Sequence, residues 1–67
     1  MSESLADGLV REQARCIELL GQYRSLGPVG MFGAAMIESA LNQCSQAMAS
    51  GDIVAMARSY ERLKEFE

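Results

Sequence analysis

The sequence predicts an all-α protein of three helices, and three observations support this class. Ala, Leu, Met, Glu, Gln and Arg dominate the 67 residues, threonine is absent, and residues that favour strands are few. Apolar residues recur at intervals of three and four, which is the spacing of one helix face. Glycine or proline interrupts this pattern at residues 27–28 and 51, so we expect helices over about 4–26, 29–50 and 52–66.

The length allows one small domain, residues 1–67, and a domain of this size buries only about 60% of its unfolded surface. Apolar residues make up 49% of the chain, but many of them are alanine and five are methionine. The core of one chain would therefore be thin. We expect a dimer or a higher oligomer.

The first helix begins at Ser4, which precedes Asp7 by three residues, as in a capping box. It ends at Gly27, which suits the position after a helix C-cap, and Pro28 follows. Gly21 lies inside the helix at a cost of about 1 kcal/mol relative to Ala, so we expect it to pack closely against another backbone. The expected core face comprises Leu5, Leu9, Cys16, Leu20 and Tyr23, broadened by Ala14 and Ile17.

The second helix opens near Pro28 or Val29, and its first turns are apolar on every side. Such a helix must be covered on every side, which two other short helices cannot do. We therefore expect an intermolecular interface here, comprising Val29, Met31, Phe32, Gly33, Met36 and Ile37. The uninterrupted apolar run is about half of the ~20 residues that a membrane span needs, so we expect no membrane insertion.

The residues Ser50, Gly51 and Asp52 form a connector, because Gly51 can end one helix and Asp52 can cap the next. Helices two and three should therefore fold back as a hairpin. The expected buried face of the third helix is Ile53, Met56, Ala57, Tyr60 and Leu63, with Phe66 beyond it. The expected exposed face is Arg58, Ser59, Glu61, Arg62 and Glu65.

The charge pattern disfavours nucleic acid as a partner. Nine acidic and six basic residues give a net charge of −3, and there is no concentrated basic face. Most bases have an acid within one helical turn, in the pairs Asp7/Arg11, Arg15/Glu18, Arg58/Glu61 and Arg62/Glu65. The acidic N-terminal segment does not have the pattern of a secretory signal, so we expect a cytoplasmic protein.

Catalytic chemistry is not indicated. Histidine is absent, and acidic residues and cysteines do not occur at metal-ligand spacing, so we expect no enzyme, no metal and no cofactor. Cys16 and Cys44 lie on the expected core faces and should be free, buried thiols that are not paired with each other.

A small-ligand binder is the alternative function. The glycine-rich segment 27–33 leads into a helix N-terminus, where anions can bind. A nucleotide-sequestering oligomer could use Gly30 together with Arg11, Arg15 or Arg24 of a neighbouring subunit. A third possibility is a structural subunit of a larger assembly.

Two parts of the sequence pattern resemble known protein families. Residues 51–62, with Gly51-Asp52 at the turn and Tyr60 in the following helix, resemble the turn and second helix of a single tetratricopeptide repeat. The segments 9–15, 27–34 and 51–56 resemble small accessory proteins of phages and prophages, including Mu-like transposable phages. The second resemblance implies a non-enzymatic interaction protein that binds and modulates a host defence or regulatory protein.

Overall fold

A computed structural model describes residues 3–67 of the chain. It contains the helices α1 (Leu5–Ser25), α2 (Met31–Ser50) and α3 (Ile53–Lys64), with a short 3-10 turn, η1 (Gly27–Gly30), between the first two. No strand occurs among the described residues. The predicted all-α class and the three helices are therefore confirmed.

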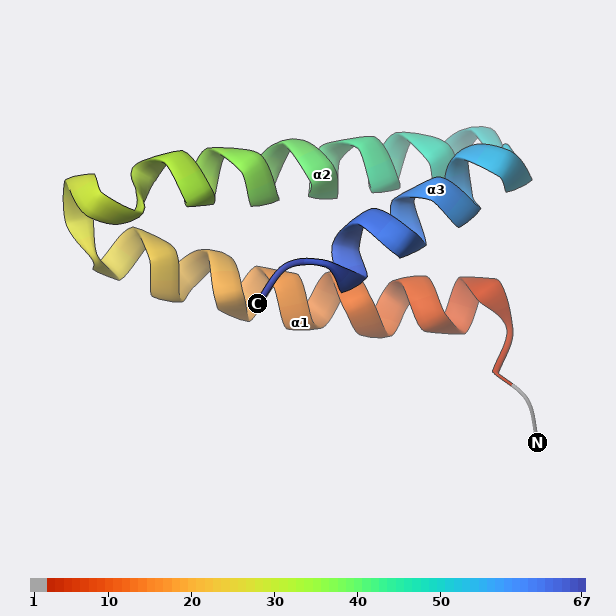
Figure 1. Ribbon diagram of the computed structural model, residues 1–67. Coiled ribbons are helices and arrows are strands. Elements are labelled where there is room, and N and C mark those ends of the chain that lie inside the picture. Colours follow the sequence, from red (N-terminus) through yellow and green to blue (C-terminus); the bar gives the residue numbers. More distant parts are fainter. Residues whose placement is uncertain (1–2) are drawn as a thin grey trace.

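The long helices α1 and α2 form an antiparallel hairpin, and α3 folds back from the far end of α2 (Figure 1). α3 crosses the hairpin diagonally and contacts both other helices. The C-terminus lies beside the middle of α1 (Figure 1). The expected hairpin between the second and third helices is thus present.

The helix ends follow the predicted caps. The Ser4 hydroxyl accepts a hydrogen bond from the Asp7 amide at 3.1 Å, and the Asp52 carboxylate accepts one from the Ala55 amide at 3.1 Å. Gly27 and Gly51 have φ of 69° and 71°, the left-handed conformation that favours glycine.

The start of the second helix differs from the expectation. Residues Gly27–Gly30 form the 3-10 turn, and the α-helix begins at Met31 rather than at 28–29. The tighter turn is needed because Gly30 packs directly against the backbone of Tyr23. Gly21 differs as well: nothing lies within 4 Å of the position of an added Cβ, so the expected close packing is wrong.

The core lies between the three helices and consists mainly of small or medium side chains. Leu9, Cys16, Ile37, Cys44 and Leu63 are fully buried. The remaining buried hydrophobic residues are Leu20, Ala34, Ala40, Ala47 and Met56. Within residues 3–67, none of the helices combines the length and apolarity needed to cross a bilayer.

The buried face of α3 is rotated from the one expected. Met56, Ser59 and Leu63 face the core, whereas Ile53 and Ala57 are exposed. The diagonal crossing explains the difference, because it leaves the first turn of α3 at the edge of the hairpin (Figure 1). Ile17 of α1 is also exposed, whereas Glu12, which lies between Leu9 and Cys16 in the sequence, is buried.

Candidate functional site

The end of the α1–α2 hairpin is held together by Tyr23. A Cβ at Gly30 would overlap the carbonyl oxygen of Tyr23, and a Cβ at Gly33 would lie 2.9 Å from carbons of its ring. The Tyr23 hydroxyl also donates to the carbonyl oxygen of Glu67 at 2.9 Å. Glycines therefore let the first turn of α2 approach α1 closely.

The large side chains of η1 and of the start of α2 point outward beside this close approach. Val29 is 88% exposed, Phe32 79% and Met31 66%. The exposed hydrophobic residues at this end of the molecule form the hairpin-end patch, which we define as Leu26, Val29, Met31, Phe32 and Met36. Scaled by the full areas of such residues, the five together expose roughly 600 Å².

The structure separates the six residues expected at an interface. Val29, Met31, Phe32 and Met36 are exposed, and Leu26, which sequence reasoning missed, joins them. For Ile37 the expectation is wrong, because its side chain is fully buried in the core of its own chain. Gly33 is half-buried and packs against the Tyr23 ring rather than facing outward.

Ile37 is buried while neighbouring large side chains are exposed, and this difference has a simple physical cause. Sequence reasoning assumed that an all-apolar turn must be buried on every side. In the structure α1 covers only the side that carries Ala34 and Ile37, because small residues allow the closer contact. The opposite side of the same turn carries the larger residues and remains uncovered.

One ion pair joins the two helices that carry the patch. Arg24 of α1 and Glu38 of α2 lie 2.7 Å apart, and both side chains are largely exposed. No residue of the patch carries a charge, so this pair is the nearest charge along the sequence on either side of it. The patch is consequently a neutral apolar surface on a protein of net charge −3.

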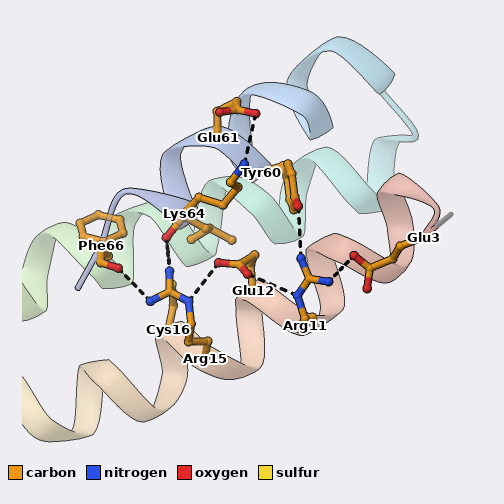
Figure 2. Close-up of polar contacts among 10 residues, drawn as sticks. Glu3, Arg11, Glu12, Arg15, Cys16, Tyr60, Glu61, Lys64 and Phe66 are labelled. Carbon is orange, nitrogen blue, oxygen red and sulfur yellow. Dashed lines mark hydrogen bonds and ion pairs between the residues drawn. The ribbon is translucent and has the colours of Figure 1, made fainter.

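A second cluster, the α1–α3 seam, is polar and contains two of the arginines considered for ligand binding. Figure 2 shows Glu12 of α1 between Arg11 and Arg15. The Glu12 side chain is almost fully buried and pairs with the Arg15 Nε at 3.0 Å. Arg15 also donates to the main-chain carbonyl oxygens of Leu63 at 2.7 Å and Phe66 at 2.8 Å.

Arg11 completes the seam from the other side of Glu12. Its guanidinium pairs with Glu3 and donates to the Tyr60 hydroxyl at 3.2 Å (Figure 2). Arg11 and Arg15 thus tie α1 to α3, and Arg15 satisfies carbonyl groups at the C-terminal end of α3. The expected surface pairs of Arg11 with Asp7 and of Arg15 with Glu18 are wrong, because both arginines turn toward Glu12 and α3 instead.

The four residues considered for an anion site are not brought together within one chain. Arg11 and Arg15 belong to the α1–α3 seam, whereas Arg24 pairs with Glu38 near the other end of α1. Thirteen residues of helix, about 20 Å, separate Arg11 from Arg24. Gly30 is buried against the Tyr23 backbone.

Both cysteines are buried and unpaired, as expected. The Cys16 thiol donates weakly to the Leu63 carbonyl oxygen at 3.5 Å, and Cys44 lies 4.0 Å from the sulfur of Met48. Burial raises the pKa of both thiols, which keeps them in the unreactive protonated form near neutral pH. Across residues 3–67, no three side chains of His, Cys, Asp or Glu type gather closely enough to hold a metal ion.

Comparisons with protein-family models, curated proteins and solved structures found no match to this chain.

Proposed function

We propose that this is a non-enzymatic interaction protein, encoded by a phage or prophage, which self-associates and binds a host defence or regulatory protein in the bacterial cytoplasm. The observation that supports it most directly is the hairpin-end patch. Five hydrophobic side chains are exposed there, next to a core built largely from small residues. A partner that covered the patch would remove that surface from water.

The size of the patch fits an interface. A standard protein–protein contact buries about 800 Å² on each partner, and the patch supplies roughly three quarters of that from its five side chains. At about 25 cal/mol per Å², covering it would contribute on the order of 15 kcal/mol before the costs of association are subtracted. Methionine and phenylalanine, which supply three of its five side chains, are common in interface cores.

The charge distribution also favours contact between two copies at this patch. Two chains that each carry −3 repel each other over most of their surfaces. The patch has no charged residue, so two copies can approach there without facing like charges.

A nucleotide-sequestering function has less support. Arg11, Arg15 and Arg24 all have carboxylate partners in their own chain, and Arg15 additionally holds two carbonyl groups of the C-terminal segment. An anion that recruited them would have to replace these contacts. Association with proteins requires no such rearrangement.

The proposal can be tested by affinity purification from a lysate of the bacterial host. The tagged protein is compared with Phe32→Asp, which places a charge in the patch, and with Gln46→Asp, which adds the same charge on an exposed polar position of α2. We expect a host protein that co-purifies with the wild type and with Gln46→Asp but not with Phe32→Asp.

A thermal-shift screen against nucleotides tests the alternative. A ligand present at 100 times its Kd would stabilise the fold by about 2.7 kcal/mol, which is a clear rise in Tm. Such a rise, combined with no host protein in the purification, would contradict the proposed function.

A further inference from the structure

The six basic side chains differ in whether they pair with a carboxylate. Arg11, Arg15, Arg24 and Lys64 each pair with a carboxylate. Within residues 3–67, Arg58 and Arg62 have no carboxylate at ion-pair distance. The sequence pattern predicted pairs with Glu61 and Glu65, and the structure does not contain them.

These two arginines lie one turn apart on α3 and border two adjoining hollows. The first hollow lies between α2 and α3 and has a volume of about 260 Å³. No acidic residue lines it; its lining residues are Gln43, Ala55, Arg58, Ser59 and Arg62. Arg62 donates to the Gln43 side-chain oxygen, which holds its guanidinium toward α2.

The second hollow is an open, very shallow groove on the outer face of α3, lined by residues of that helix and its C-cap alone, among them the acidic residues Glu61 and Glu65. Its apolar half consists of Ile53, Val54 and Ala57 from the first turns of the helix, and Ile53 and Val54 are more than half exposed. Arg58 and Arg62 line this groove as well. The groove therefore combines an apolar surface with two arginines that have no carboxylate partner.

We infer that the α3 face bordered by Arg58 and Arg62 binds an acidic amphipathic helix of a partner protein. Aliphatic side chains of that helix would cover Ile53 and Val54, and its carboxylates would pair with the two guanidinium groups. A free phosphate would use the arginines but leave the apolar half uncovered, so the helix accounts for more of the surface.

Glu61 and Glu65 lie on the same outer face and limit how the partner can be placed. Glu61 is 3.9 Å from Lys64, whereas no such pair occurs for Glu65 among residues 3–67. Carboxylates of the partner are therefore expected on the side of the groove next to α2, where the lining is free of acids.

This inference rests on the proposed function only in treating the protein as one that binds other proteins. Its surface is separate from the hairpin-end patch, because the patch lies at the start of α2 and Ile53 follows the end of α2 (Figure 1). The length of α2, about 30 Å, lies between them. Binding at the α3 face and association through the hairpin-end patch can consequently be tested independently.

The test uses two fluorescent helical peptides that share one leucine stripe and differ only in the flanking residues, glutamate in one and lysine in the other. Binding is followed by fluorescence anisotropy. We expect the wild-type protein to bind the glutamate peptide at least about tenfold more tightly than the lysine peptide, with the preference weakening as salt is added.

Three variants locate the site. Arg58→Glu should abolish the preference for the glutamate peptide, while Lys64→Glu makes the same change in net charge at a position outside both hollows and should retain it. Val54→Ser should weaken the binding of the glutamate peptide, because it removes apolar surface from the groove. Circular dichroism establishes that each variant keeps its helices.

Three outcomes would overturn the inference. The first is equal affinity of the wild-type protein for both peptides, or no binding of the glutamate peptide. The second is an equal effect of Arg58→Glu and Lys64→Glu, which would indicate a response to net charge alone. The third is binding of fluorescent ATP that Arg58→Glu abolishes and Val54→Ser does not affect, which would show a small-anion site. The mass of the protein in solution, which tests the hairpin-end patch, is independent of all three.

Discussion

Gly30 and Gly21 differ in how much space surrounds them. Gly30 is packed so tightly against Tyr23 that an added Cβ would overlap its carbonyl oxygen, and a backbone atom cannot move away cheaply. Gly21 is exposed, has open space around it and does not have a positive φ. The sequence pattern predicted a close contact at Gly21, since a glycine inside a helix costs stability relative to alanine.

Replacement of each glycine by alanine should therefore change stability in opposite directions. Gly30→Ala is expected to lower the free energy of unfolding by about 2–3 kcal/mol through overpacking. Gly21→Ala should raise it by about 0.5–1 kcal/mol, because alanine favours the helix and restricts the unfolded chain. Urea unfolding followed by circular dichroism measures both changes. A stabilising Gly30→Ala would contradict the packing of η1 against α1.

The buried thiols predict a loss of stability at high pH. Burial raises the pKa of Cys16 and Cys44 in the folded protein above that in the unfolded chain, where a thiol titrates near 8.5. Their contribution is thus complete below the unfolded pKa and is lost as the pH rises through the folded pKa. Between pH 8 and pH 10, the Tm of the wild type should fall further than that of the double variant Cys16→Ala, Cys44→Ala. Equal falls would show that folding does not raise the pKa of the thiols.

Among the elements, α1 adds side-chain donors to the C-terminal end of α3, which the Glu65 and Phe66 amides also cap. Arg15 donates to the carbonyl oxygens of Leu63 and Phe66 and neutralises the buried Glu12. Carbonyl groups at a helix end have no partner within the helix, so a side chain from another element can satisfy them. The α1–α3 seam therefore holds the last turn of the chain in place.

Arg15→Met should lower the free energy of unfolding by about 1–2 kcal/mol, because two carbonyl groups and the Glu12 carboxylate lose a charged donor. Arg24→Met is the matched control: its pair with Glu38 is exposed, and its loss should cost about 0.5 kcal/mol or less. Urea unfolding of both variants checks the difference. Equal losses would mean that the seam contributes no more than a surface ion pair.

The sequence predicted the ends of these elements better than their faces. Ser4, Gly27, Gly51 and Asp52 act through neighbouring backbone atoms, so local pattern is sufficient to identify them. The buried face of α3 depends on the angle at which it crosses α1 and α2, which no local pattern contains. For the same reason, Ser59 was expected to be exposed and is buried.

The seam was missed because its partners are far apart in sequence. Arg15 and Leu63 are separated by 47 intervening residues. Glu12 lies close in sequence to Arg11, Arg15 and Glu18, a pattern that is typical of a solvated helix face. One signal was present: Glu12 follows Leu9 and precedes Cys16 at the spacing of the core face. A charged residue at that spacing indicates burial if cations are close enough to neutralise it.

At the scale of the whole molecule, one chain leaves too much apolar surface uncovered for the size of its core. The sequence pattern named four of the five patch residues as part of an expected interface, and the structure shows that these four are exposed. The pattern could not predict that Ile37 would turn inward while Phe32 turned outward, since that depends on the contact between Gly33 and Tyr23.

The exposed position of Phe32 predicts which property a charge there will change. Phe32→Asp should keep the helices and the unfolding behaviour of a single chain, because the side chain has few contacts within its own chain. Its effect should fall on association, since a charge without a partner is costly in a dry contact. Gln46→Asp, on the exposed polar part of α2, should leave association unchanged.

The molecular mass in solution, measured by light scattering over a range of micromolar concentrations, shows whether the hairpin-end patch joins two copies of the chain. For a chain of 7.3 kDa, the wild type and Gln46→Asp should have the mass of two or more chains, and Phe32→Asp the mass of one folded chain. A wild-type protein that is a folded monomer throughout this range would contradict the assignment of the hairpin-end patch as an interface, and so would a Phe32→Asp variant with an unchanged mass.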